Sequence, residues 1–258
     1  MDGHHKLIRW RFVFHGCIDG YSRVVTFLKC STNNRADTVL DSFLGCLSTY
    51  TTPLRIRTDQ GLENIQVARW MFNKYGVSKR PVLTGLSVHN QRIERLWRDL
   101  GTYVVCIYKD IFRYMEATNL LDPSDEQDLF ALHYTFLPRL NRSCEEFVTQ
   151  WNHHPLSTES NRSPLQVWTE GLHRNWDIAR DCVTDMIDAN EDMDHYGVDF
   201  DAPLPELEDG NIVHIPELRA EISEDRLIAL QNANIDPLRD DGNSGIDVYE
   251  QVLNIIKG

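Results

Sequence analysis

The chain has 258 residues and a net charge of −13, which would argue against a nucleic-acid partner if the charge were evenly spread. The charge is unevenly distributed. Residues 1–115 hold 17 Lys and Arg against 9 Asp and Glu, residues 116–180 hold 5 against 10, and residues 181–258 hold 4 against 20. Only the first part is therefore suited to bind a polyanion. No apolar run approaches the roughly 20 residues of a membrane span, and no secretory signal is visible at the start, so we expect an intracellular protein with no membrane partner. The six cysteines include no Cys-x-x-Cys zinc pattern, and we expect them to be reduced thiols.

Strands and helices are predicted to alternate over the first third of the chain. Two runs of β-forming residues flank the turn signature Asp19-Gly-Tyr-Ser22 and predict a hairpin, in which Asp19 is an ordinary turn former. Further elements follow from apolar residues at strand or helix spacing. The predicted elements are strands over 9–14 and 23–29, a helix over 35–48, a strand over 54–58, a helix over 63–75 and a short edge strand over 81–83.

Helical patterns dominate the middle of the chain. Apolar residues at three- and four-residue steps predict a long helix over residues 88–115, bent at Gly101. A second helical tract over residues 125–151 is predicted to break near Pro138, because proline has no backbone N–H to donate.

The last part of the sequence changes in composition. Ser163 and Pro164 look like the cap and the first residue of a further helix. Beyond residue 181 acidic residues and prolines dominate, and we expect an acidic, partly disordered appendage. The order strand, strand, helix, strand, helix, strand, helix predicts an α/β domain with helices on a mixed sheet.

Three acidic residues of the basic first part are suited to metal chemistry. Asp59 ends a predicted strand, where α/β sheets present ligand sites, and Glu94 follows 35 positions later on the long helix. Asp2 precedes the hairpin, as if on a strand at the centre of the sheet. Two carboxylates 4 Å apart repel by about 4 kcal/mol at an effective dielectric constant of 20. Divalent cations such as Mg²⁺ prefer oxygen ligands and would reverse that effect.

Each carboxylate also has an ordinary interpretation. Asp59 would be a turn cap at the end of a strand, and Asp2 would belong to a disordered terminus. Glu94 would be a surface residue paired with Arg98 four positions later. Glu63 is expected to support a helix N-terminus and to take no part in chemistry.

Four stretches of the sequence resemble one known family. They are "CIDGYSRVVTFLKCSTNNRADTVLDSFL", "RIRTDQGLENIQVARWMFNKYG", "HNQRIERLWRDL" and "FVTQWNHHPLSTESNRSPLQVW". Together they are similar to the integrase core domain of retroelement integrases and their transposase relatives, and more closely to transposon-derived animal proteins built on that core. The resemblance spans roughly residues 1–170 and implies an RNase H-like mixed β-sheet flanked by helices.

A metal-dependent reaction on DNA is what this resemblance implies. It assigns the family's Asp, Asp, Glu triad, as catalytic residues and as ligands of two Mg²⁺ or Mn²⁺ ions, to Asp2, Asp59 and Glu94. A DNA phosphodiester would be attacked first by water and then by a 3′ hydroxyl in strand transfer. Because only Met1 precedes Asp2, we expect most of the family's first strand to be missing, and an inactive copy is then an alternative.

Basic and amide side chains near Glu94 are candidates for DNA contact. Arginine grips phosphates with two parallel hydrogen bonds, although a solvated charged face is the usual reading of such a run. Asn90-Gln91 stands where the family usually has Asn-Gly, and the glutamine departs from that pattern. The candidates are Lys79, Arg80, Asn90, Arg92, Arg95 and Arg98.

The resemblance also suggests a division of the chain and leaves alternatives open. We expect a catalytic core over residues 1–121, its helical C-terminal part over 122–180 and an acidic tail over 181–258. The tail would contact the chain's own basic face or a basic partner, and a homo-oligomer and a nuclear location are further expectations. Two alternatives to an integrase are a catalytically inactive, domesticated domain that binds nucleic acid or protein, and a simple nuclease.

Overall fold

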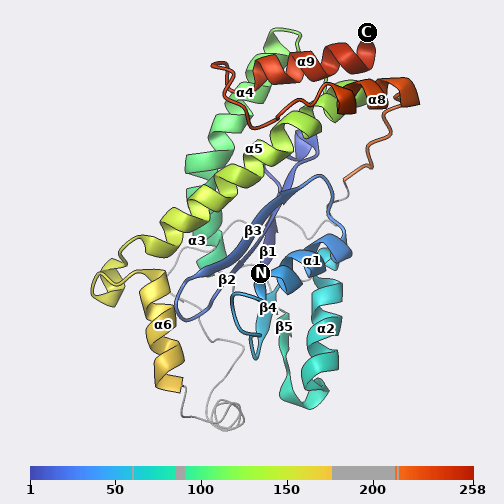
Figure 1. Cartoon of the computed structure of the whole chain (residues 1–258). Coiled ribbons are helices and arrows are strands. Elements are labelled where there is room, and N and C mark those ends of the chain that lie inside the picture. Colours follow the sequence, from blue (N-terminus) through green and yellow to red (C-terminus); the bar gives the residue numbers. More distant parts are fainter. Residues whose placement is uncertain (60, 85–90, 176–212, 214) are drawn as a thin grey trace.

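The structure is a computed structural model of the whole chain, and it describes every residue except 60, 85–90, 176–212 and 214 (Figure 1). In that part of the chain no helix combines the length and the apolar character needed to cross a membrane. Strands and helices follow one another as the α/β prediction requires.

Three antiparallel strands form the first sheet. In spatial order they are β1 (Asp2–His4), β2 (Val13–Ile18) and β3 (Val25–Ser31). The predicted hairpin is therefore confirmed. Asp19 closes its turn, because the Oδ2 atom accepts hydrogen bonds from the backbone N–H groups of Tyr21 (3.1 Å) and Ser22 (2.7 Å). Asp19 is thus a turn former, as expected.

The first predicted strand, over residues 9–14, starts too early. Ile8–Trp10 form a 3₁₀ turn, η1, and Arg11 follows with a φ of 59°, in the left-handed region that interrupts a strand. Trp10 and Phe12 are both buried. These buried aromatic residues alternate with charged residues as in a strand, but the strand β2 itself begins only at Val13.

Two short parallel strands lie beside the first sheet. They are β4 (Ile56–Thr58) and β5 (Val82–Thr84). The third strand and the edge strand of the sequence analysis are thereby confirmed, with shifts of one or two residues at their ends. The backbone nitrogen of Met1 donates to the carbonyl oxygen of Arg57 (2.8 Å) and so joins β1 to β4.

Helical residues continue from 91 to 117 in three pieces, as the predicted long helix requires. These are α3 (Gln91–Leu100), a π-helical turn η5 (Gly101–Val105) and α4 (Cys106–Ala117). The bend predicted at Gly101 coincides with the start of the π-helical turn. Such turns insert one extra residue into a helix and redirect the faces that follow.

The helix α5 (Glu126–His153) is continuous, so the predicted break near Pro138 is wrong. A proline inside a helix costs about 3 kcal/mol. Burial offsets this cost, since each buried apolar side chain contributes about 1.5–3 kcal/mol. Those that α5 buries on both sides of the proline include Leu129, Leu132, Phe136, Leu140, Cys144 and Phe147.

The end of α5 and the next helix explain part of the quoted motif "QWNHHP". Asn152 is buried, and its side-chain amide bonds both backbone groups of Val25 on β3 (2.9 and 3.1 Å). The helix α6 (Pro164–Asn175) begins as predicted. Ser163 Oγ accepts from the backbone N–H of Gln166 (3.3 Å), while the Gln166 side chain accepts from the Ser163 backbone (2.8 Å), a reciprocal capping box.

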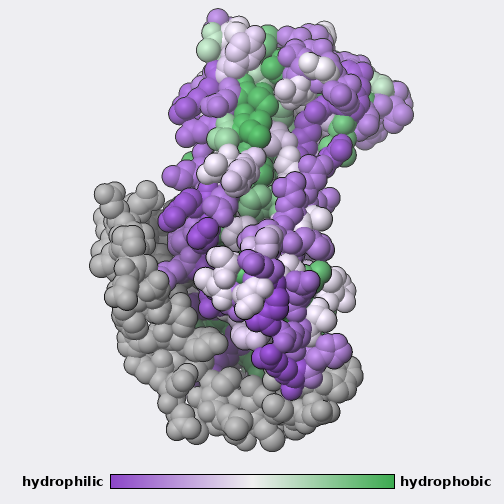
Figure 2. Space-filling view, turned by 90° about the vertical axis from the view of Figure 1, so that its left-hand side faces the viewer, coloured by the Kyte–Doolittle hydropathy of each residue, from purple (hydrophilic) through white to green (hydrophobic). Residues whose placement is uncertain are grey.

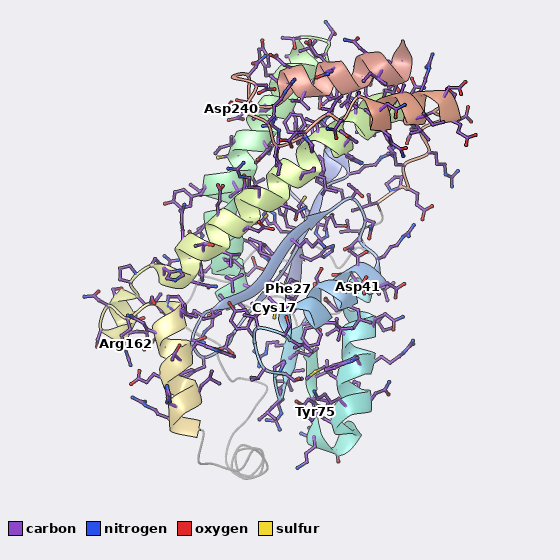
Figure 3. All side chains as sticks on the ribbon, viewed as in Figure 1. Cys17, Phe27, Asp41, Tyr75, Arg162 and Asp240 are labelled. Carbon is purple, nitrogen blue, oxygen red and sulfur yellow. The ribbon has the colours of Figure 1, made fainter. Side chains whose placement is uncertain are left out.

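Two apolar clusters are built on the strands. The larger cluster lies between β2, β3 and the helices α3, α4 and α5. The smaller one joins Met1 and β4 to α1 (Ala36–Cys46) and α2 (Ile65–Tyr75), both close to their predicted ranges. Figure 1 shows the helices α3 and α5 on one side of the strands and α1 and α2 on the other. Cys17 and Phe27 of the first sheet pack against this smaller cluster (Figure 3).

Of the described C-terminal helices, α9 (Ile246–Lys257) packs on α5, and α8 (Glu224–Asn232) packs on α9 (Figure 1). Both contribute to the larger apolar cluster. The Tyr249 hydroxyl donates to the carbonyl oxygen of Leu120 (3.0 Å), and Lys257 Nζ donates to Asp125 Oδ2 (2.7 Å). The helices α8 and α9, which belong to the predicted acidic tail, are therefore part of the folded core. Residues 181–212 and 214 of the predicted acidic, partly disordered tail lie outside the described residues.

Candidate active site

The three candidate carboxylates come from three elements that meet at one edge of the strands. Asp2 is the first residue of β1, Asp59 directly follows β4, and Glu94 lies in the first turn of α3. The hydrogen bond from Met1 to Arg57 holds β1 beside β4, so the first two carboxylates belong to neighbouring strands.

Asp2 is held by two hydrogen bonds and lies within the electrostatic influence of Asp59 and Glu94. Its Oδ2 atom accepts from the indole Nε1 of Trp97 (2.9 Å), and its Oδ1 atom accepts from the backbone N–H of Gly3 (2.8 Å). Burial and then the charge of Asp59 raise the pKa of Asp2 to about 7, with a smaller contribution from Glu94. The indole hydrogen bond and the nearby amino group of Met1 act in the opposite direction.

Asp59 is oriented by the turn that follows its strand. Its Oδ1 atom accepts from the backbone N–H of Gly61 (3.2 Å) and from the side-chain amide of the buried Asn64 (3.0 Å). The charge of Asp59 raises the pKa of Glu63, after the larger effect of burial. Asp59 therefore does cap a turn, as its ordinary interpretation requires, and it also acts electrostatically on its neighbours.

Glu94 is half-buried, as are Asp2 and Asp59. Burial raises its pKa, and the charge of Asp59 adds to the increase. Within the described residues no ion pair joins it to Arg98, the partner that the ordinary interpretation required. Arg95 instead pairs with Asp99 at 3.7 Å.

The donor set fits a hard divalent cation, although the ligands are not assembled around a point. Carboxylate oxygens are the ligands that Mg²⁺ and Mn²⁺ prefer. Throughout the described ranges, no group of three or more His, Cys, Asp or Glu side chains is close enough to hold a metal ion. The repulsion that raises the pKa values of Asp2 and Glu94 is the kind that a shared cation would remove.

The candidate DNA contacts lie mainly along α3. Arg95 and Arg98 are exposed, and the side chain of Arg95 is 71% exposed. Arg92 is half-buried on the same helix. Lys79 ends the 3₁₀ turn η3 (Val77–Lys79) and is half-buried, whereas Arg80 is exposed. Asn90 lies outside the described residues.

Trp97 and Gly16 are site residues that the sequence analysis did not identify. Trp97 belongs to the larger apolar cluster and is only 5% exposed. Its indole nitrogen nevertheless reaches Asp2. A signal was present, since Trp97 lies three positions after Glu94 and therefore close to the same helix face. Gly16 lies against the Trp97 ring, and nothing in the neighbouring sequence indicates this contact.

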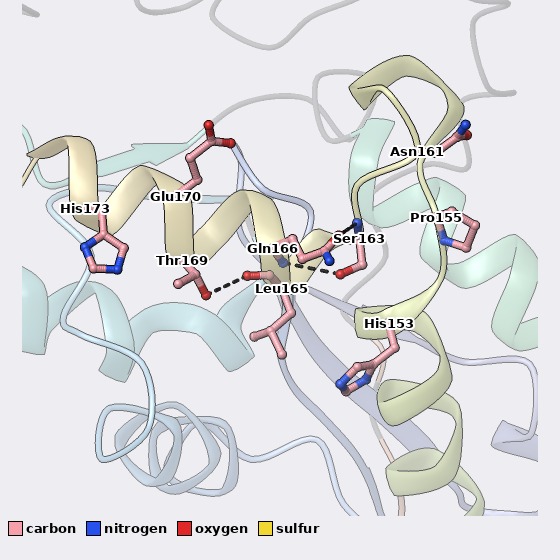
Figure 4. A pocket seen from close by; sticks show the side chains of 9 residues that line it. All are labelled: His153, Pro155, Asn161, Ser163, Leu165, Gln166, Thr169, Glu170 and His173. Atoms are coloured by element: carbon pink, nitrogen blue, oxygen red, sulfur yellow. Dashed lines mark hydrogen bonds between the residues drawn. The ribbon is translucent and has the colours of Figure 1, made fainter.

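Two other surface features lie apart from these carboxylates. A pocket of about 740 Å³ opens between the end of α5 and α6, and His153, Ser163 and His173 help to line it (Figure 4). On the side of the molecule that Figure 2 shows, an apolar strip runs between hydrophilic flanks. Tyr103 and Ile107 of η5 and α4 are 67% and 54% exposed.

Comparisons with known proteins identify the family. The sequence pattern of the integrase core domain matches residues 1–181 of the 258. No curated protein matches, and no solved structure does. The matched region includes all three candidate carboxylates and the helices α1 to α6. The chain therefore belongs to the integrase core domain family, and its α/β fold is RNase H-like.

Proposed function

We propose that this chain catalyses integrase-type phosphoryl transfer on DNA, with Asp2, Asp59 and Glu94 as the ligands of two Mg²⁺ or Mn²⁺ ions. Membership of the family supports polynucleotidyl transfer as the general class of function. One arrangement carries the assignment of residues. Asp2 opens β1 beside β4, which Asp59 follows, and α3, the helix of Glu94, is tied to Asp2 through the hydrogen bond from Trp97.

The chain's own carboxylates would hold and orient the ions. When bound, a pair of divalent cations supplies activation of the attacking hydroxyl and stabilisation of the leaving oxygen. Asp59 is already oriented by Gly61 and Asn64, and Asp2 is oriented by its two hydrogen bonds. The half-buried Glu94 would complete the ligand set from α3. The nucleophile would be water in the first step and a DNA 3′ hydroxyl in strand transfer.

DNA would be held mainly through its phosphates. The exposed Arg95 and Arg98 flank the proposed metal site on α3, and residues 1–115 carry 17 basic against 9 acidic side chains. Binding should therefore weaken steeply as the salt concentration rises. Lys79, Arg80 and Arg92 are proposed as further contacts, and Asn90 belongs to the same proposal. A nuclear location follows from DNA as the substrate.

A second candidate function has one observation in its favour. Within the described residues the carboxylates do not form a ready-made group of three ligands. A domesticated, catalytically inactive domain that binds nucleic acid or protein would need no such group. The apolar strip of Figure 2 would suit self-association, and the acidic residues beyond 181 would suit a basic partner or the chain's own basic face.

A nicking and joining assay on labelled duplex DNA separates these functions. We expect Mg²⁺- or Mn²⁺-dependent nicking and strand joining by the wild-type chain, and loss of both in Asp59→Asn and Glu94→Gln. Asp41→Asn is the matched control, because Asp41 is an exposed carboxylate on α1 (Figure 3). Nicking without joining would indicate a simple nuclease. Salt-sensitive DNA binding without nicking would indicate the inactive domain.

A further inference from the structure

One indole connects two of the proposed metal ligands. Trp97 lies on α3, three positions after Glu94, and its Nε1 donates to Asp2 Oδ2 at 2.9 Å across 95 positions of sequence. An indole N–H can only donate. The side chain is 5% exposed, so water has little access to replace this hydrogen bond.

The ring is fixed from two sides. Gly16 on β2 pairs with Asp2 on β1, and a Cβ atom at Gly16 would lie 2.7 Å from Trp97 Cη2, closer than real Cβ contacts allow. On β1, the ring of His4 stacks on the indole with a centroid distance of 5.3 Å and an interplanar angle of 29°. The absence of a side chain at Gly16 therefore gives the indole the space to reach Asp2.

We propose that Trp97 is a positioning residue, which sets the orientation of the Asp2 carboxylate relative to Glu94 so that both can bind the same divalent cation. This inference rests on the proposed function. Metal-ligating carboxylates are commonly oriented by hydrogen bonds from residues that do not touch the metal, and loss of such a partner typically weakens metal binding 10–100-fold. Because Trp97 and Glu94 share one rigid helix, α3 would transmit the position of one ligand to the other.

The variant Trp97→Phe tests the proposal by Mn²⁺ binding, measured on the full chain through the electron paramagnetic resonance signal of free Mn²⁺. Phenylalanine keeps an aromatic ring and removes the N–H. We expect the Mn²⁺ dissociation constant to rise roughly 10–100-fold, while nicking at saturating Mn²⁺ recovers most of the wild-type rate. The matched control is Trp10→Phe, since Trp10 is buried and its Nε1 also donates to a carboxylate, Glu116 (2.7 Å), on α4. That variant should bind Mn²⁺ as the wild type does.

A measurement on the wild-type chain makes the test independent of how the variants fold. In a sample with ¹⁵N-labelled tryptophan, titration with Mg²⁺ should shift the indole N–H resonance of Trp97 and leave that of Trp10 in place. No shift at Trp97 despite Mg²⁺ binding, or unchanged Mn²⁺ affinity in a folded Trp97→Phe, would overturn the positioning role and leave the proposed function standing. If Asp2→Asn binds Mn²⁺ as tightly as the wild type, the metal site itself is misassigned and the proposed function fails.

Discussion

Truncation of Tyr249 should destabilise the whole integrase core, although the residue lies in the acidic C-terminal segment beyond the family match. Tyr249 is fully buried on α9, and its hydroxyl donates to the Leu120 carbonyl at 3.0 Å. Removing a buried aromatic side chain costs about 3–5 kcal/mol, and the lost hydrogen bond adds about 1 kcal/mol. Tyr249→Ala should therefore lower the free energy of unfolding by about 4–6 kcal/mol, a large fraction of a typical 5–15 kcal/mol.

Urea unfolding followed by tryptophan fluorescence measures this effect. With a slope of about 3 kcal/mol per molar urea, the midpoint should fall by about 1.3–2 M. Tyr249→Phe removes only the hydroxyl and should cost about 1 kcal/mol. Asn254→Ala changes an exposed residue of the same helix and should stay within about 0.5 kcal/mol.

The reasoning would be refuted if Tyr249→Ala left the main transition in place and only detached α9. In that case the C-terminal segment would be a dispensable appendage. If the expected result holds, a truncation that tests whether the acidic residues oppose DNA binding has to retain α8 and α9, because their loss would unfold the site rather than uncover it.

Three further predictions concern the site and its surroundings. Chelation of divalent cations should abolish nicking, and added Mn²⁺ should restore it; nicking that persists in excess chelator would contradict the metal assignment. Arg98→Ala should reduce the slope of log K for DNA binding against log salt by about 0.9, whereas Arg142→Ala, on the exposed surface of α5, should not change it. Burial, opposed in part by the Asn33 carbonyl, lowers the pKa of His15 from 6.5 to about 4, so the unfolded chain binds its proton first as the pH falls. Neutral His15 should thus contribute about 3 kcal/mol to the free energy of unfolding above pH 6.5, and this contribution should be lost between pH 6.5 and 4. The prediction is contradicted if the urea midpoint of a His15→Gln variant falls with decreasing pH as steeply as that of the wild type.

Turns and helix caps could be predicted from the sequence because they depend on neighbouring residues. The hairpin follows from β-forming runs around Asp19, whose side chain bonds backbone groups only two and three positions away. The start of α6 follows from Ser163 and Gln166, which cap the helix within one turn. In each case the residues that interact are close in sequence, so their spacing specifies the geometry.

The candidate site could be predicted only in part from the sequence. The position of Asp59 at a strand end and of Glu94 on the following long helix came from periodicity, and their pairing with Asp2 came from the resemblance. The family match includes all three residues, and their roles as ligands remain a proposal. Pro138 shows the limit of local rules, because its cost in the helix is offset by burial against distant elements.

Sequence by itself therefore determined the α/β order of elements, the turn and cap residues, and the family. Only the tertiary structure decided that Trp97 reaches Asp2 over Gly16, and that α9 closes the core around Tyr249. Contacts between residues about a hundred positions apart depend on how whole elements pack, and an apolar or aromatic side chain carries no local mark of the partner that it will meet.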